Sequence, residues 1–179
     1  QARQRMNAGT SQSSQAKQRR IDGITLRRAT LGDVQALAAL EQQIFSGDRL
    51  STRQFRHHVR ATGSDLLLAA EGSGVLGYAL LLSRRGSRLA RLYSIAVAPE
   101  ARGLGLGARL LAAAEDAACE RGRSELRLEV RVDNRAAIAL YAADGYQVFG
   151  RHQGYYEDGC DALRMARPLP PANIHGPSG

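Results

Sequence analysis

The sequence contains no tryptophan, only two cysteines and no long apolar run. Cys119 and Cys160 are too few and too far apart to predict a disulfide framework or a zinc site. Free thiols are typical of cytoplasmic proteins. No stretch approaches the ~18 consecutive apolar residues of a membrane span. We therefore expect a cytoplasmic globular protein with no metal site and no membrane partner.

Acidic residues are missing from the start of the chain. Residues 1–20 carry five basic side chains and no acid, which leaves +3 of the formal charge of +8 for the remainder. This segment is polar, so we expect a disordered basic tail, although Arg and Ser without acid are also typical of a transit peptide. The remainder is nearly balanced in charge and poor in aromatic residues that could stack on bases. We therefore expect no direct nucleic-acid partner.

One domain accounts for most of the chain. A length of 179 residues with 44% hydrophobic residues is enough for a single sizeable core. We place this domain at residues 21–169 and a proline-containing C-terminal tail at residues 170–179.

Hydrophobic periodicity and turn residues predict a mixed α/β chain. Ser51 and Asn134 are suited to cap helices, and Gly122 to end one. The strands that flank the third helix should be parallel, whereas the strands joined by hairpin turns should be antiparallel. The predicted helices cover approximately residues 33–45, 51–61, 103–121 and 134–143. The predicted strands cover approximately residues 24–28, 65–71, 75–84, 89–97, 125–130, 146–151 and 161–169.

A glycine-rich loop joins the strand over 89–97 to the longest predicted helix. Gly103, Gly105 and Gly107 leave backbone N–H groups uncovered at the start of this helix. These donors, with the positive end of the helix dipole, form an anion site. Glycines in this pattern also occur in simple tight turns, so the phosphate site is a hypothesis.

Two phosphate-binding motifs fit this loop. Gly103–Ala108 matches the dinucleotide pattern G-x-G-x-x-A, with Glu129 downstream as a ribose ligand. Against this motif, Pro99 and further residues separate the strand from the first glycine, and little chain remains after Glu129 for a doubly wound sheet. The alternative motif, Arg/Gln-x-x-Gly-x-Gly/Ala, is filled by Arg102–Gly107.

Pattern alone does not identify a catalytic pair. Glu129 shares one face of its strand with Arg127 and Arg131, which is most simply a solvated, salt-bridged strand face. Tyr141 lies on the next helix, where an aromatic residue is most simply part of the core.

A resemblance adds to this reading. From about Ile24 to Leu169 the chain resembles the GNAT superfamily of acetyltransferases, through the Arg102–Gly107 loop. The segment from Leu128 to Tyr146 is similar to bacterial ribosomal-protein alanine N-acetyltransferases, which acetylate the N-terminal amine of a ribosomal protein. The resemblance implies an α/β fold with a central mixed sheet and helices on both faces, and acetyl-coenzyme A as co-substrate.

The resemblance also implies roles for individual residues. Glu129 falls on the catalytic glutamate of that family and Tyr141 on its catalytic tyrosine, and the Tyr155–Tyr156 pair is shared in kind. Contacts to acetyl-coenzyme A are implied for Ile95, Ala96, Val97, Arg102, Gly103, Leu104, Gly105, Leu106, Gly107, Ala108 and Asn134.

The acceptor region departs from the family. A Pro-Trp pair usually follows the first helix, whereas this chain has Phe45–Leu50 there. A single carboxylate base suits an α-amine with a pKa of about 7.8 better than a lysine with a pKa of about 10.4. We expect an N-acetyltransferase for a protein or peptide N-terminus, with a ribosomal protein among the candidate partners. Acetylation of a small-molecule amine and a non-catalytic acyl-coenzyme A binding module are the alternatives.

Overall fold

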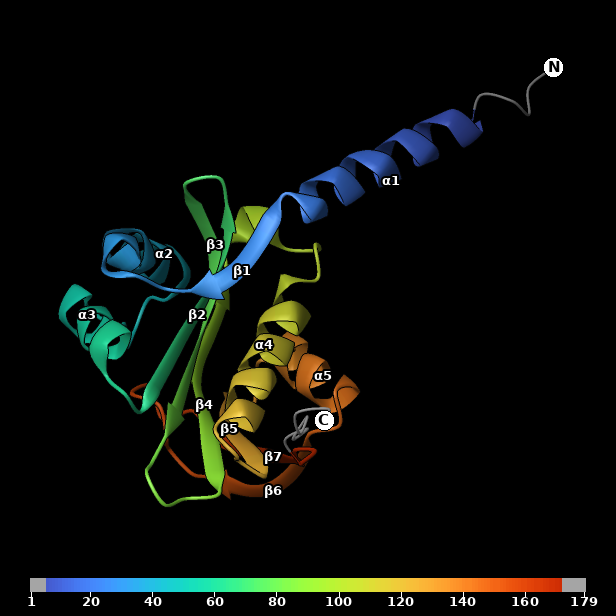
Figure 1. The fold of residues 1–179 in the computed structure, drawn as a ribbon. Coiled ribbons are helices and arrows are strands. Elements are labelled where there is room, and N and C mark those ends of the chain that lie inside the picture. Colours follow the sequence, from blue (N-terminus) through green and yellow to red (C-terminus); the bar gives the residue numbers. More distant parts are fainter. Residues whose placement is uncertain (1–5, 172–179) are drawn as a thin grey trace, which may run out of the picture.

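The computed structural model describes residues 6–171, which form a mixed sheet covered by helices (Figure 1). The strands are β1 (Ile24–Arg28), β2 (Ser64–Glu71), β3 (Gly74–Ser83), β4 (Leu89–Val97), β5 (Glu125–Arg131), β6 (Gln147–His152) and β7 (Ala162–Pro168). The α-helices are α1 (Met6–Asp22), α2 (Val34–Ile44), α3 (Thr52–Arg60), α4 (Leu106–Glu120) and α5 (Arg135–Ala143). Single 3-10 turns are η1 (Leu31–Asp33) and η2 (Pro99–Ala101).

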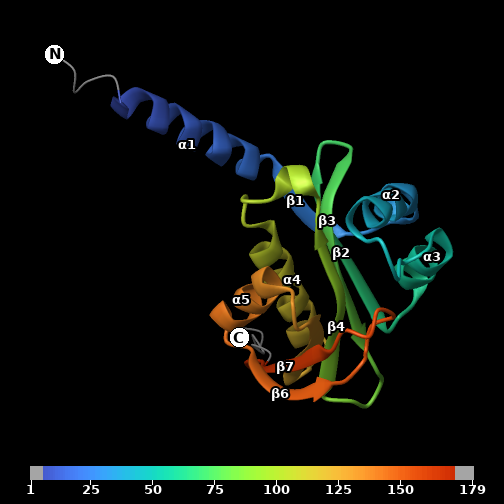
Figure 2. The ribbon, with the colours of Figure 1, turned by 180° about the vertical axis from the view of Figure 1, so that it is seen from behind.

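The seven strands form one sheet in the order β1-β2-β3-β4-β5-β7-β6. Only β4 and β5 pair in parallel, and every other neighbouring pair is antiparallel. Helices α2 and α3 lie on one face of the sheet, and α4 and α5 lie on the other (Figure 1, Figure 2). The predicted mixed sheet with helices on both faces is therefore confirmed. A doubly wound parallel sheet, which the dinucleotide motif would need, is excluded.

Local sequence signals set the ends of several helices. The Ser51 hydroxyl accepts a hydrogen bond from the Gln54 amide, and the Gln54 side chain accepts one from the Ser51 amide, which completes a capping box at α3. The Asn134 side chain accepts from the Ala137 amide at 3.1 Å and caps α5. Gly122 ends α4 with a φ of 70°, in the left-handed region. All three predicted caps are confirmed.

The core lies on both sides of the central strands. Leu68 of β2 and Leu80 and Leu81 of β3 are fully buried, and α4 covers one side of these strands. On the other side, the Phe55 ring of α3 packs edge-to-face against Tyr78 of β3, with centroids 5.4 Å apart. Leucine-rich strands buried on both faces explain why the middle of the sheet needs helices on each side.

One buried carboxylate fixes the connection between α2 and α3. Glu41 accepts a hydrogen bond from the Tyr78 hydroxyl at 2.6 Å and another from the Leu50 amide at 3.0 Å. Burial raises the pKa of Glu41, while these two hydrogen bonds oppose the rise. The Tyr78 hydroxyl also lies 2.8 Å from the Ser94 hydroxyl of β4. This chain of polar contacts holds the end of the α2–α3 loop against the sheet.

The N-terminal segment differs from the expectation of a disordered tail. Met6–Asp22 forms α1, which projects away from the sheet (Figure 1). Its Ala, Gln, Lys and Arg residues favour a helix, and it contains no proline. Arg20 contacts the body by a salt bridge to Glu71 at 3.3 Å. The domain boundaries remain predictions, and residues 172–179 of the expected C-terminal tail lie outside the described residues.

Candidate active site

The sheet is split between β4 and β5. These strands pair only over Leu89–Leu92 and Glu125–Leu128. Beyond this ladder, β4 continues along β3 and β5 continues along β7, so the two strands separate. Tyr93 is the extra residue of a bulge in β4, because Leu92 and Ser94 pair with consecutive residues of β3. A bulge increases local twist and helps to turn β4 away from β5.

Backbone groups of β4 face this split. The Ala98 amide donates to the Leu76 carbonyl at the β3 side, with a distance of 2.7 Å. Because the amides of successive strand residues alternate in direction, Ile95 and Val97 direct their backbone polar groups toward the split. Ala96 directs its backbone toward β3 instead. The structure therefore separates the three residues that the resemblance grouped as backbone contacts.

The glycine loop leads from η2 into α4. Gly103 and Gly105 have φ values of 80° and 75°, a region that favours glycine, and no heavy atom lies within 4 Å of the place a Cβ would take. The six backbone amides of residues 103–108 donate no hydrogen bond to any described residue. They lie at the N-terminus of a helix of 15 residues, so donors and helix dipole together favour an anion here.

Gly107 has a different structural role. A Cβ at this position would lie 3.3 Å from Cδ2 of Leu140, so Gly107 allows α4 and α5 to pack closely. Arg102 is exposed and makes no ion pair with any described residue. Leu106 is buried in the core, whereas Leu104 is half-buried in the loop.

Glu129 lies on β5 directly after the last residue that pairs with β4. Its side chain is 15% exposed, and Arg91 Nε donates to its Oε2 at 3.0 Å. Arg91 Nη2 donates in turn to the Tyr155 hydroxyl at 2.9 Å. One carboxylate oxygen of Glu129 is thus held by Arg91, and Oε1 has no described partner. Sequence reasoning missed Arg91, which depends on the register between β4 and β5.

Tyr141 lies on α5 and is 4% exposed, with its ring 5.8 Å from the ring of Tyr146. Its hydroxyl has no hydrogen-bond partner among the described residues. Burial, with a smaller contribution from Tyr156, raises the pKa of Tyr141, so the phenol keeps its proton at neutral pH.

The loop between β6 and β7 carries Tyr155 and Tyr156, which relate to both candidate catalytic residues. Burial raises the pKa of Tyr156 to about 12, with smaller contributions from its neighbours, including Tyr155 and Glu129. The Tyr156 ring lies 5.1 Å from the ring of Tyr155, which Arg91 links to Glu129, and Tyr156 also contributes to the raised pKa of Tyr141. The structure brings the two predicted catalytic residues to one region through this tyrosine pair, which alternation along single strands could not show.

The α2–α3 loop borders the same region. The neighbouring Asp48 carboxyl raises the pKa of Glu157, so the α2–α3 loop approaches the β6–β7 loop. Asp48 belongs to the segment Phe45–Leu50, where the sequence departs from the family, and Glu157 directly follows Tyr155 and Tyr156 in the sequence.

Asn134 is the last of the candidate cofactor contacts. The Asn134 side-chain carbonyl oxygen caps α5, which leaves its side-chain NH₂ without a partner among the described residues.

Over residues 6–171, no group of three His, Cys, Asp or Glu side chains is arranged to hold a metal ion. Within the same range, no helix is both long and apolar enough to cross a membrane.

A split mixed sheet, with uncovered amides at the following helix, defines a class of acyl-transferring enzymes. The model of the acetyltransferase (GNAT) family matches residues 34–146, and the chain belongs to this family. It is an N-acetyltransferase, and membership implies that acetyl-coenzyme A is the acetyl donor. The expected fold and enzyme class are confirmed.

Two sequence relatives and one solved structure are similar to this chain over most of its length. N-alpha-acetyltransferase RimI of Mycobacterium tuberculosis is 36% identical over 153 residues, which are 80% of this chain and 92% of that protein. An N-alpha-acetyltransferase of Saccharolobus solfataricus is 32% identical over 162 residues, covering 81% and 93%. The crystal structure of the ribosomal-protein-S18-alanine N-acetyltransferase from Escherichia coli matches with a TM-score of 0.74 and 29% identity, over 86% of this chain and 98% of that one.

Proposed function

We propose that this enzyme acetylates the α-amine of a protein N-terminus, with Glu129 as general base and Tyr141 as general acid. The observation that carries the proposal is the split between β4 and β5. Backbone groups of Ile95 and Val97 line the β4 side of this split. Glu129 is the first residue on the β5 side that no longer pairs with β4. The names of the relatives in Mycobacterium tuberculosis and Saccharolobus solfataricus support an N-terminal acceptor.

The residues present fit acetyl-coenzyme A. The six uncovered amides of residues 103–108 would hold its pyrophosphate, and the guanidinium of Arg102 would add positive charge. The backbone groups of Ile95 and Val97 would hold the arm that carries the thioester, and the free NH₂ of Asn134 offers one more donor. When bound, acetyl-coenzyme A supplies an acetyl group activated as a thioester.

Proton transfer is the contribution of the side chains. A protonated amine cannot attack a thioester, so Glu129 accepts its proton, either directly or through a water molecule. The neutral amine nitrogen then bonds to the acetyl carbon while the carbon–sulfur bond breaks. Tyr141 donates its proton to the departing thiolate, since burial has kept that phenol protonated. The second proton lost by the amine nitrogen returns through solvent to the Tyr141 phenolate. In this scheme the Val97 amide polarises the carbonyl oxygen of the thioester.

Arg91 orients the base in this scheme. Arg91 binds Oε2 of Glu129 and leaves Oε1 for the acceptor.

The acceptor class follows from amine chemistry, because an α-amine with a pKa of about 7.8 is deprotonated far more often at neutral pH than a lysine with a pKa of about 10.4. A ribosomal protein is our candidate acceptor, because the Escherichia coli protein of the same fold is named for one.

An acetylation panel tests the proposal. The enzyme is incubated with acetyl-coenzyme A and peptides with a free N-terminal alanine, N-terminally blocked lysine peptides or small amines, and products are identified by mass spectrometry. Acetylation confined to free N-termini is expected. Acetylation of lysines or small amines alone would contradict the proposed acceptor.

Variants on the accepted peptide test the roles of the two residues. Glu129→Gln should lower turnover by about 10²–10⁴-fold and leave acetyl-coenzyme A affinity unchanged. The loss should shrink at high pH, where the amine deprotonates unaided, whereas the loss in Tyr141→Phe should not shrink in this way. Glu125→Gln is the matched control, because Glu125 lies on the same strand face and pairs with Arg127 at 2.6 Å. Unaltered turnover in Glu129→Gln would remove Glu129 as the base.

A further inference from the structure

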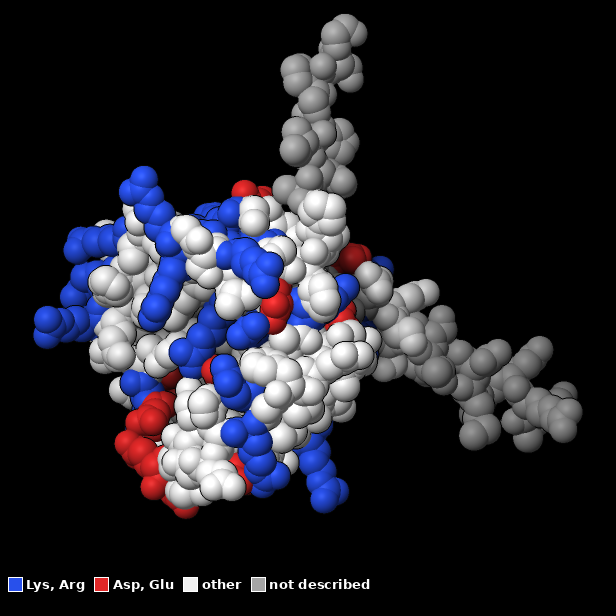
Figure 3. Space-filling model, turned by 90° about the horizontal axis from the view of Figure 1, so that it is seen from below, with Lys and Arg blue, Asp and Glu red and all other residues white. Residues whose placement is uncertain are grey.

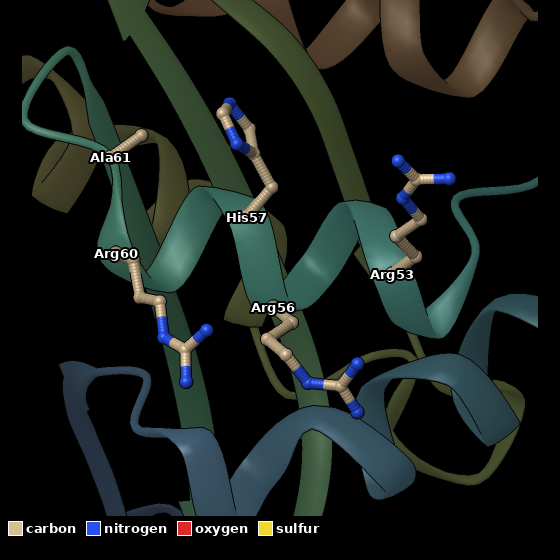
Figure 4. A pocket seen from close by; sticks show the side chains of 5 residues that line it. All are labelled: Arg53, Arg56, His57, Arg60 and Ala61. Atoms are coloured by element: carbon tan, nitrogen blue, oxygen red, sulfur yellow. The ribbon is translucent and has the colours of Figure 1, made fainter.

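Helix α3 carries a row of arginines on its outer side. Arg53, Arg56 and Arg60 follow helical spacing, while Phe55 on the opposite side is fully buried against the sheet. Together with His57 and Ala61, these arginines line an open hollow of about 440 Å³, and Figure 4 shows the five side chains. The row faces solvent and takes no part in the core.

The turn between β3 and β4 extends this row. The Ser83 amide donates to the Gly63 carbonyl at 2.8 Å, so the turn lies beside the end of α3. Arg84 and Arg85 on this turn are exposed. Figure 3 shows basic side chains gathered on the side of the molecule where α3 lies in Figure 1. We call the following five residues the arginine surface: Arg53, Arg56, Arg60, Arg84 and Arg85.

The arginine surface lacks counter-charge. Residues 49–64 and 72–99 contain no Asp or Glu. None of its five guanidinium groups pairs with a carboxylate among the described residues. Other arginines do pair with acids, namely Arg20, Arg27, Arg28, Arg91, Arg121, Arg127, Arg131, Arg151 and Arg167. The near balance of charge outside residues 1–20 thus conceals a strongly cationic face, which attracts anions.

We propose that the arginine surface binds the phosphate backbone of RNA. The planar guanidinium group matches a phosphate with two parallel hydrogen bonds, which favours arginine for this contact. The exposed aromatic residues Tyr93, Phe149 and Tyr155 lie elsewhere in the sequence and none belongs to this surface, so binding relies on phosphates rather than on stacked bases. The choice of RNA among polyanions rests on the proposed function, because a ribosomal protein acceptor assembles with RNA.

Salt-dependent RNA binding tests the proposal. A labelled single-stranded RNA is titrated with the full chain, and fluorescence anisotropy is recorded over a range of salt concentrations. In Arg53→Gln/Arg56→Gln/Arg60→Gln, the slope of log affinity against log salt should fall by about 2, at ~0.7 for each lost phosphate contact. That change corresponds to an affinity loss of about 10²-fold at ~0.1 M salt relative to 1 M salt. The variant Arg84→Gln/Arg85→Gln should lose about 1.4 in slope by the same rule.

The control removes three basic charges elsewhere. Lys17, Arg19 and Arg135 are exposed and have no ion pair with a described residue, so their triple exchange to Gln should keep most of the affinity. An equal loss in this control would show that affinity follows net charge and would overturn the proposal. Absence of RNA binding by the native chain, or stronger binding to an acidic peptide or to anionic vesicles, would overturn it as well.

Peptide acetylation separates this proposal from the proposed function. The arginine triple variant should acetylate a short N-terminal peptide within a few-fold of the native rate while it loses RNA affinity. RNA binding without any N-terminal acetylation by the native chain would overturn the proposed function and the reason for choosing RNA, and would leave a phosphate-binding surface. Acetylation without RNA binding would overturn the arginine surface alone.

Discussion

Gly103 and Gly105 can be tested as the floor of the phosphate site. In Gly103→Ala/Gly105→Ala, two methyl groups enter space that no protein atom occupies within 4 Å. They would therefore not clash with the chain, but they would stand where we place the pyrophosphate. We expect acetyl-coenzyme A to lose its stabilising effect on this variant, because the amides can no longer approach the phosphates.

The magnitude follows from linkage. A ligand at about 100 times its Kd stabilises the native state by about 2.7 kcal/mol. For a chain of this size, each kcal/mol shifts Tm by about 2–4 °C, so the native protein should gain about 5–10 °C. The variant should show almost none of this gain. Its own Tm in the absence of ligand should also fall, since a left-handed non-glycine residue costs about 1–2 kcal/mol.

A matched variant isolates the ligand effect from the backbone strain. Gly86 and Gly122 have φ values of 79° and 70°, with no atom within 4 Å of an added Cβ, and both lie outside the loop. Gly86→Ala/Gly122→Ala should therefore lose similar stability while it keeps the full ligand-dependent gain. Thermal melts with and without acetyl-coenzyme A, supported by calorimetry, make the comparison. An undiminished gain in the loop variant would refute the loop as the phosphate site.

Two further predictions concern stability and the N-terminal segment. Burial, followed by the nearby Asp144, raises the pKa of Glu115 from 4.5 to about 7, so the folded state binds a proton that the unfolded chain releases. The free energy of unfolding should fall on the order of 2 kcal/mol as pH rises through this window, and thermal melts should show this fall abolished in Glu115→Gln but retained in Glu125→Gln. Deletion of residues 1–20 should leave peptide acetylation unchanged and lower Tm by a few degrees at most, because the salt bridge from Arg20 to Glu71 is surface-exposed and worth about 0.2–1 kcal/mol. Loss of activity toward a ribosomal acceptor at low salt would instead make this segment a docking arm.

Signals confined to a few neighbouring residues predicted much of the fold. Ser51 and Asn134 cap helices because a short polar side chain can reach an amide two or three residues ahead. The strand–helix–strand unit predicted the parallel pair β4 and β5, since a crossover helix between neighbouring strands returns the chain in the same direction. These features depend on the chain within a few residues, or on connectivity alone.

Features that depend on distant pairing were not predictable. The Arg91–Glu129 salt bridge requires the register of β4 against β5, and the role of Gly107 requires the distance from α4 to Leu140. The arginine surface was not predictable either, because the total charge does not show where the acidic residues lie relative to these arginines. The polarity of residues 1–20 predicted disorder, whereas the structure has the helix α1 over Met6–Asp22. Many residues of this segment favour a helix, and it contains no proline.

The short ladder between β4 and β5 joins two antiparallel parts of the single sheet, β1 to β4 and β5 to β7. Only four residue pairs, from Leu89–Leu92 and Glu125–Leu128, join them. In the proposed site, β4 and the loop after it contribute backbone groups, whereas the chain from β5 onward contributes Glu129 and Tyr141. Under the proposed function, most of the groups that bind the acetyl donor precede β5 in the sequence, whereas Asn134 and both proton-transfer residues lie in β5 or after it. Under that proposal, substitutions at Glu129 or Tyr141 change proton transfer and leave the backbone amides of residues 103–108 unaltered.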